Sequence, residues 1–149
     1  MICVGTTEQS SREAVEFAAA HDDIFATVGV HPHDAKDGYA DIARLAGEKN
    51  VVAVGEIGLD YYYTHSPRDV QILALETQLQ IAQDHKLPVS FHVREAFEDF
   101  WPVLDNFHGI RGVLHSFTDT IETLDTALNR GLYIGANGIC TFTKDDRQK

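Results

Sequence analysis

Short apolar runs recur along the chain, separated by longer stretches in which apolar and polar positions alternate at helical spacing. Most runs are rich in Val and Ile, and several are almost wholly apolar, as in strands that are buried on both faces. The pattern predicts six strands, at Ile2–Gly5, Ile24–Val30, Val51–Ile57, Val89–Val93, Gly112–Leu114 and Leu132–Gly135.

Helix-start signals lie between these runs. Ser66, Pro67 and Asp69 predict an N-cap, a helix-starting proline and a capping-box acid for a long helix that reaches His85. The apolar positions of this helix recur on one face and are Ile72, Leu75, Leu79 and Ala82.

Two other capping-box patterns predict shorter helices. Ser10 with Glu13 precedes a helical stretch at Ala14–Ala20, and Asp119 with Glu122 precedes another. Strands that alternate with helices in this way are typical of parallel α/β proteins with right-handed crossovers.

Two α/β architectures fit this alternation, a doubly wound open sheet and a TIM-type (β/α)₈ barrel. No Gly-rich phosphate loop follows the first run, which weakens the dinucleotide-binding version of the open sheet. No repeat or linker interrupts the chain, so residues 1–149 are expected to form one domain. A complete barrel needs ~250 residues, so if the chain is of the barrel type it is an incomplete barrel of about six βα units.

Composition narrows the classes of function. The 149 residues are 44% hydrophobic and 23% charged, an ordinary globular mixture, and no apolar run approaches the ~20 residues that span a bilayer. Cys3 and Cys140 form no CxxC pair, and the N-terminus lacks the features of a secretion signal. We therefore expect a cytoplasmic protein without a membrane partner.

The formal net charge of −11 does not indicate the basic face with which many proteins bind nucleic acid. Three explanations stay open. The substrate is small or short, bound metal ions supply the local positive charge, or the acidic surface serves solubility alone.

Ionisable residues follow four consecutive strands, and the carboxyl ends of parallel strands meet at one rim. The residues are His31 and His33 after the second run, Glu56 and Asp60 in or after the third, His92 and Arg94 in or after the fourth, and His115 after the fifth. A carboxylate among imidazoles is a nitrogen and oxygen donor set for Zn, Mn or Co, with Mg as a further candidate.

Within this rim, Glu56, His92 and His115 are the candidate metal ligands, and Glu56 is the candidate catalytic residue because its two oxygens could bridge two ions. Arg94 lies on the same side of its strand as His92 and is the candidate phosphate-binding residue, with a structural salt bridge as the alternative. His31-Pro32-His33 looks like a metal-binding HxH, although the proline could simply shape the loop. Tyr61-Tyr62-Tyr63 could line a substrate cleft or cap the barrel mouth.

Five segments in this order resemble the TatD-type deoxyribonucleases, which belong to the amidohydrolase-like metal-dependent hydrolases. The segments are Gly29-Val30-His31-Pro32-His33, Gly55-Glu56-Ile57-Gly58-Leu59-Asp60-Tyr61, Ser66-Pro67-Arg68, Phe91-His92-Val93-Arg94 and His115-Ser116-Phe117. The resemblance implies a TIM barrel with one or two divalent ions that hydrolyses phosphodiester bonds of DNA, as a 3′ exonuclease. It implies that Glu56 bridges the ions, that His92 and His115 bind one of them, and that Arg94 lies by the substrate phosphate.

Two parts of the family pattern have no match in this chain. The family's first strand carries an HxH, which His31 and His33 do not represent, and its last strand carries a catalytic aspartate, a role not given to Asp145 or Asp146 in the polar tail. We therefore expect the first and last barrel strands to be missing, which leaves open edges that favour self-association. Alternatives are hydrolysis of another ester or amide on the same scaffold, and a non-catalytic fragment.

Overall fold

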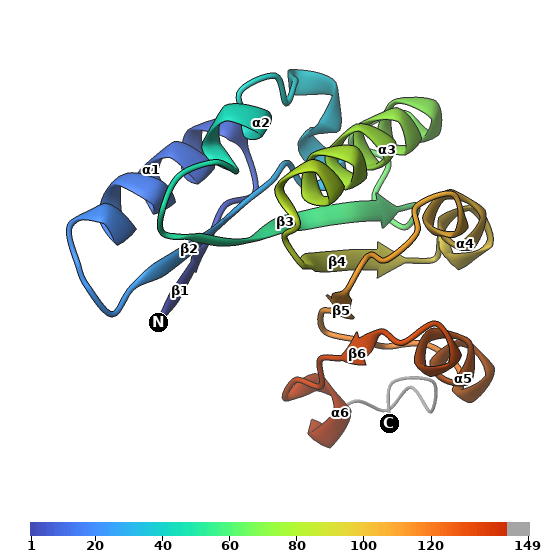
Figure 1. The fold of residues 1–149 in the computed structure, drawn as a ribbon. Helices are drawn as coiled ribbons and strands as arrows, with labels where there is room; N and C mark the ends of the chain where they lie inside the picture. Colours follow the sequence, from blue (N-terminus) through green and yellow to red (C-terminus); the bar gives the residue numbers. More distant parts are fainter. Residues whose placement is uncertain (143–149) are drawn as a thin grey trace.

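Six parallel strands form one sheet, and their order in space, β1 to β6, follows their order in the sequence (Figure 1). The computed structural model describes residues 1–142. The strands are β1 (Ile2–Val4), β2 (Phe25–Val28), β3 (Val51–Asp60), β4 (Val89–Arg94), β5 (Gly112–Leu114) and β6 (Tyr133–Ile134). A doubly wound sheet would reverse its strand order at a switch point, so the sequential order confirms the barrel-type α/β architecture.

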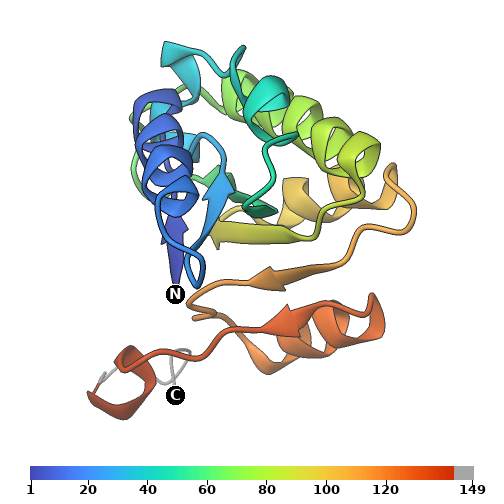
Figure 2. The same cartoon turned by 60° about the vertical axis from the view of Figure 1, so that its left-hand side comes forward.

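Helices connect the strands, and α1, α3, α4 and α5 lie along one side of the curved sheet (Figure 2). The helical elements are α1 (Glu8–Ala19), the 3₁₀ helix η1 (Pro32–Asp37), α2 (Ile42–Leu45), α3 (Arg68–His85), α4 (Phe97–Asp105), α5 (Ile121–Asn129) and α6 (Ile139–Phe142). None of these helices in residues 1–142 is long and apolar enough to cross a bilayer. The long helix expected to reach His85 is confirmed as α3.

The predicted N-caps of two helices are wrong by one or a few residues. Helix α1 begins after Thr7, whose side chain accepts a hydrogen bond from the backbone of Ser10, while Ser10 bonds back to the backbone of Thr7. The capping box is therefore Thr7 with Ser10, not Ser10 with Glu13. Helix α5 is capped by Thr120 rather than by Asp119.

Ser66 does not cap α3 either, because its hydroxyl is used in a longer-range contact. It donates to the carbonyl oxygen of His33 at 2.8 Å and accepts from the backbone N–H of Lys36 at 3.2 Å. Pro67 occupies the N-cap position without a side-chain hydrogen bond. Ser66 thus joins the start of α3 to the loop that follows β2.

The main core lies between the sheet and the helices. Leu75, Leu79 and Ala82 of α3 are buried, which confirms the predicted apolar face of this helix. They pack with fully buried side chains of the central strands, namely Val28, Ile57, Leu59, Phe91 and Leu114.

The opposite face of the sheet lines a cavity of about 490 Å³. Residues of all six strands contribute to its wall, among them Val4, Thr27, Ala53, Ser90, Val113 and Tyr133. Val4 and Tyr133 are 51% and 73% exposed. Within residues 1–142, β1 and β6 are the two edges of the sheet and pair with one neighbour each. The sequence predicted burial on both faces of the strands, but only the helix-covered face is closely packed here.

Candidate metal centre

The ionisable side chains predicted to share a rim are contributed by four neighbouring segments. They come from the segment after β2 (His31 before η1 and His33 within it), from β3 (Glu56 and Asp60), from β4 (His92 and Arg94) and from the position after β5 (His115). The register of the sheet explains part of this convergence, because it pairs Gly58 with His92 and Asp60 with Arg94 across β3 and β4.

Asp60 is the most deeply buried of these groups, at 1% exposure. Its Oδ2 atom contacts Nε2 of His92 at 2.8 Å and Nε2 of His33 at 3.0 Å. Its Oδ1 atom accepts the backbone N–H groups of Tyr62 and Tyr63 at 3.0 and 2.9 Å. Burial alone would raise the pKa of Asp60, but these hydrogen bonds lower it below the ordinary value. The ionised carboxylate only accepts hydrogen bonds, so both ring nitrogens must donate to it.

Glu56 faces the other ring nitrogen of His92, with Oε1 at 3.2 Å from Nδ1. Burial opposes ionisation of Glu56, yet the hydrogen bond from His92 and the charges of His31, His92 and His115 keep its pKa below the ordinary value. For His92, burial lowers the pKa, and the contacts with Glu56 and Asp60 outweigh burial and raise it. Both nitrogens of His92 are thus positioned by carboxylates from the same strand, β3.

His31 packs against two other imidazoles of the rim, those of His33 and His92. Its ring centroid lies 4.3 Å from that of His33 and 4.3 Å from that of His92. Burial, followed by the nearby charge of His92, lowers the pKa of His31 to about 4. His31 is therefore neutral at pH 7, which is the protonation state in which an imidazole binds a metal ion.

This donor set fits a divalent metal ion. One ligand atom from each of His31, His33 and His92 lies within 4.8 Å of the others. Two atoms bound to one ion at ~2.1 Å are separated by roughly 3.0–3.4 Å, and the 3.2 Å between Glu56 and His92 lies in this interval. Imidazole nitrogen with carboxylate oxygen suits a borderline divalent ion.

His115 and Arg94 lie beside this cluster without being part of it. Together with His92 they line a cavity of about 280 Å³, whose other wall includes Asn137 and Ile139. The His115 ring is exposed, and its Nε2 is 3.0 Å from the hydroxyl of the neighbouring serine. Its charge nevertheless lowers the pKa of Glu56. The structure thus brings Glu56 to His92, and His92 into one cavity with Arg94 and His115.

The guanidinium of Arg94 lies 3.8 Å above the ring centroid of Tyr62. No carboxylate within residues 1–142 forms an ion pair with Arg94. The structural salt bridge considered as the alternative role of Arg94 is therefore not found in this part of the chain. A guanidinium without an acidic partner retains its donors for an anion.

Two buried glutamines that were not assigned a role from the sequence support the rim from α3. The side chain of Gln78 accepts from the N–H of Val30 at 2.7 Å and donates to its carbonyl at 3.2 Å. Gln71 binds the backbone N–H and carbonyl of Asp60 in the same manner, at 2.8 and 3.0 Å. The available signal was their position on the same face as Leu75, where a polar residue is unusual.

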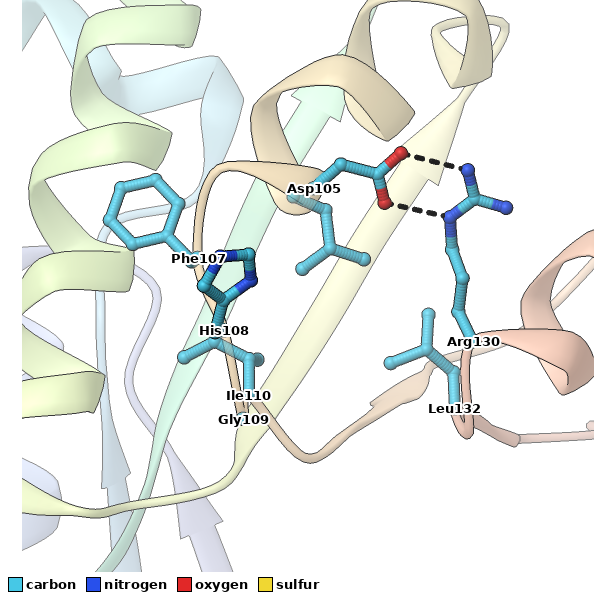
Figure 3. Close-up of a pocket in the computed structure, with 8 residues that line it drawn as sticks. Asp105, Phe107, His108, Gly109, Ile110, Arg130 and Leu132 are labelled. Atoms are coloured by element: carbon cyan, nitrogen blue, oxygen red, sulfur yellow. Dashed lines mark hydrogen bonds and ion pairs between the residues drawn. The ribbon is translucent and has the colours of Figure 1, made fainter.

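A smaller pocket of about 200 Å³ lies at the other end of the sheet (Figure 3). Asp105 at the end of α4 and Arg130 at the end of α5 form two hydrogen bonds of 2.9 Å beside it. Leu132, which precedes β6, lines the same pocket. These segments precede the amino ends of β5 and β6, so the pocket is separate from the rim at the carboxyl ends.

Comparison with known proteins agrees with this geometry. The family model described as "TatD related DNase" matches residues 1–149. The 3′-5′ ssDNA/RNA exonuclease TatD of Pantoea ananatis is 41% identical over 145 residues, which cover 93% of this chain and 56% of that protein. The uncharacterized metal-dependent hydrolase YabD of Bacillus subtilis is 32% identical over 155 residues, covering all of this chain and 61% of that protein.

Solved structures show the same fold. A hydrolase of the TatD family from Entamoeba histolytica superposes with a TM-score of 0.81 at 29% identity, covering 91% of this chain and 50% of that one. The TatD homologue YJJV of Escherichia coli superposes with a TM-score of 0.84 at 24% identity, covering 95% and 57%. The chain thus spans a little over half the length of the curated relatives it matches. Its sequence, its fold and its rim of histidines and carboxylates together establish that the chain belongs to the TatD related DNase family.

Proposed function

We propose that the rim at the carboxyl ends of β2–β5 hydrolyses phosphodiester bonds of nucleic acid with the help of one or two divalent ions. The observation that carries this proposal is the contact of Glu56 with His92, supported by Asp60 and placed beside Arg94, which has no acidic partner within the described residues 1–142. This combination offers ligands for a cation and a binding group for an anion at one site. The names of the relatives support the same class of reaction.

Glu56, His92 and His115 are the proposed metal ligands, and His31 is a further candidate because it is neutral and in contact with His92. A divalent ion bound there would lower the pKa of water and offset the negative charge of the phosphate. The donor types fit Zn or Mn best, with Mg as the remaining candidate. Positive charge from such an ion would also allow a chain of net charge −11 to bind a polyanion.

The chain's own side chains have distinct proposed roles. Asp60 holds Nε2 of His92 and so directs Nδ1 toward Glu56. Arg94 binds a phosphate oxygen through its planar donors and orients the ester in the cavity that it shares with His92 and His115. Glu56 is the proposed catalytic residue, since its ionised carboxylate lies at the centre of the rim and is largely shielded from solvent.

Arg94 also distinguishes this reaction from hydrolysis of another ester or amide. A guanidinium without a carboxylate partner favours a phosphate group, whereas a neutral ester offers it no charge. We therefore propose single-stranded DNA or RNA as the substrate class, in agreement with the name of the Pantoea relative.

A cleavage assay tests this function. The purified chain is incubated with an end-labelled single-stranded oligonucleotide and, separately, with a carboxylic ester, with added Mg, Mn or Zn and with a chelator. We expect cleavage of the oligonucleotide that requires metal, is lost in Glu56→Gln and persists in Glu122→Gln, a change at an exposed residue of α5. A preference for the carboxylic ester, or activity that survives both the chelator and Glu56→Gln, would overturn the proposal.

A further inference from the structure

Two exposed tyrosines, Tyr62 and Tyr63, lie two and three residues after Asp60, the buried carboxylate of the rim. Tyr62 is 51% exposed and Tyr63 is 43% exposed. Tyr61 differs from them, because its hydroxyl donates to Asp99 at 2.7 Å and its ring lies under the guanidinium of Arg68 at 4.2 Å. Tyr61 therefore has a structural role, whereas the hydroxyls of Tyr62 and Tyr63 form no hydrogen bond within residues 1–142.

The backbone of these two tyrosines is fixed relative to the rim. Oδ1 of Asp60 accepts the N–H groups of Tyr62 and Tyr63, while Oδ2 of the same carboxylate contacts His33 and His92. A single buried side chain thus positions both the imidazoles and the tyrosine loop. The two rings consequently lie at a defined place next to the candidate metal centre.

The rings of Tyr62 and Tyr63 both lie close to the guanidinium of Arg94. The Arg94 guanidinium lies 3.8 Å from the ring centroid of Tyr62 and 5.1 Å from that of Tyr63. Tyr63 stacks nearly parallel to His65, with ring centroids 5.7 Å apart and an interplanar angle of 15°. Tyr63 and His33 form a T-shaped pair whose ring centroids lie 5.5 Å apart. Arg94 also lines the cavity that contains His92. One side chain therefore borders both the aromatic surface and the rim.

We propose that Tyr62 and Tyr63, together with Arg94, form a stacking subsite for the bases of single-stranded nucleic acid. The subsite deepens the proposed function and rests on it for the class of substrate. Bases of a single strand are free to stack on aromatic side chains, whereas those of a duplex are not. Arg94 would bind a phosphate of the strand while the adjoining base lies on a tyrosine ring.

The charge of the chain gives a physical reason for such a subsite. Proteins that hold a single strand usually combine aromatic stacking with a basic groove. With a net charge of −11, this chain has little general attraction for phosphates. Stacking does not depend on net charge, so it can contribute affinity that the surface does not supply.

Equilibrium binding in the presence of a chelator tests the subsite apart from cleavage. The probes are a labelled thymine oligonucleotide, its uracil RNA counterpart, and a DNA strand of equal length with abasic sites. We expect Tyr62→Ala/Tyr63→Ala to weaken binding of the base-containing strands by about tenfold or more. Tyr62→Phe/Tyr63→Phe should retain the affinity within about twofold, because phenylalanine keeps the stacking face.

Two controls separate stacking from general effects. Tyr133→Ala removes a tyrosine that is 73% exposed on β6, and we expect it to leave binding unchanged. The abasic strand should bind the unmodified chain as weakly as the base-containing strands bind the double alanine variant. Equal affinity for abasic and base-containing strands, or an equal loss in the phenylalanine and alanine variants, would overturn the subsite.

Failure of the subsite and failure of the proposed function give different results. If the chain cleaves oligonucleotides and the double alanine variant has unchanged KM and affinity, the stacking subsite is wrong and the hydrolase assignment stands. If base-dependent binding is lost in the double alanine variant but no metal restores cleavage, the subsite stands and the hydrolase assignment is wrong.

Discussion

Asp60 uses its two carboxylate oxygens for two neighbouring parts of the site. One oxygen holds the imidazoles of His33 and His92, and the other holds the backbone of the loop that carries Tyr62 and Tyr63. A carboxylate behind a ligating histidine fixes the orientation of the ring and the identity of its donor nitrogen. Asp60 therefore acts on a bound ion through His92 and is a positioning residue.

The variant Asp60→Asn tests this role. Because an amide cannot accept both ring N–H groups as an ionised carboxylate does, we expect the affinity for Mn²⁺ to fall about 10–100-fold. Isothermal titration calorimetry gives the affinity, and circular dichroism shows whether the variant is folded. Asp69→Asn, at an exposed position of α3, is the matched control. A folded Asp60→Asn protein with unchanged Mn²⁺ affinity would contradict the positioning role.

Gly58 allows β3 to approach β4 closely at the position of His92. A Cβ atom at Gly58 would overlap the backbone carbonyl of His92, and its φ of +151° is unfavourable for other residues. We expect Gly58→Ala to lower the free energy of unfolding by about 1–3 kcal/mol or more, measured by chemical denaturation. Gly47→Ala, where the nearest atom lies at 3.4 Å, should have a much smaller effect. Equal effects of the two substitutions would argue against close strand contact at Gly58.

Single site residues can be predicted from the sequence where a side chain able to bind metal or phosphate lies at the end of a predicted strand. Glu56, His92, Arg94 and His115 could be selected because each lies at or after the carboxyl end of a predicted strand. Asp60 was not selected as a site residue, since an acid at the end of a strand looks the same in sequence whether it is exposed or buried. Only the three-dimensional contacts show that it is shared by two imidazoles and two backbone N–H groups.

Two glutamines on the buried, mostly apolar face of helix α3 form hydrogen bonds to the backbone of the rim. Gln78 satisfies both backbone groups of Val30, which precedes His31, and Gln71 satisfies both backbone groups of Asp60. Both glutamines are 1% exposed. A buried backbone group that loses its partner destabilises the fold, so these amides fix the strand ends from which the site residues project.

Replacing Gln78 with leucine removes its two hydrogen bonds to Val30 and substitutes an apolar side chain of comparable size. We expect Gln78→Leu to lower the free energy of unfolding by about 2–4 kcal/mol, because the N–H and the carbonyl of Val30 are left without partners. Gln80→Leu lies on the exposed face of the same helix and should have little effect. Denaturant titration of both variants makes the comparison, and an unchanged stability of Gln78→Leu would refute the assigned contact.

Asp41 connects the first two α-helices and gives stability a defined dependence on pH. Its carboxylate accepts from Arg44 and Arg12 at 2.9 Å each, and these hydrogen bonds lower its pKa from 3.8 to about 2. A depressed folded-state pKa stabilises the protein above the unfolded-state pKa, and this contribution is lost as the pH falls toward the folded-state pKa. The contribution is therefore complete above about pH 4 and disappears near pH 2.

Thermal unfolding of the unmodified chain and of Asp41→Asn checks this sign. We expect the unmodified chain to have the higher Tm at neutral pH, and the difference to shrink between about pH 4 and pH 2. Asp22→Asn is the control, since Asp22 forms no ion pair within residues 1–142. A difference that does not change with pH would show that Asp41 acts by packing rather than by charge.

The strands are predicted well because the apolar pattern determines them. The Val-rich and Ile-rich runs coincide with all six strands, although β3 extends three residues beyond Ile57 to Asp60. Gly58 lies inside this extension, where β3 contacts β4 too closely for a Cβ atom.

The helix starts are predicted less well, because more than one side chain near a helix start could serve as the N-cap. Ser10 was misassigned as an N-cap because Thr7, three residues earlier, caps α1. Ser66 was misassigned because its hydroxyl donates to the carbonyl of His33, and no side chain caps α3.

For the molecule as a whole, the strand order places the rim side chains together, and a cation bound by them would offset the net negative charge. The strands follow one another in order, so consecutive carboxyl ends deliver their side chains to neighbouring positions. The overall charge of −11 would repel a nucleic acid, whereas imidazoles and carboxylates at the rim can bind a cation that attracts it. The proposed hydrolysis of nucleic acid at this rim therefore depends on metal binding by its side chains.

Titration of the purified chain with Mn²⁺ by isothermal titration calorimetry tests that dependence most directly. The unmodified chain and Glu122→Gln, altered at an exposed acid of α5, are compared with Glu56→Gln and His92→Ala. We expect saturable binding of Mn²⁺ that is retained in Glu122→Gln and weakened about tenfold or more in the two rim variants. Absence of saturable binding by the folded chain, or binding that is equal in all four proteins, would contradict a metal centre at this rim.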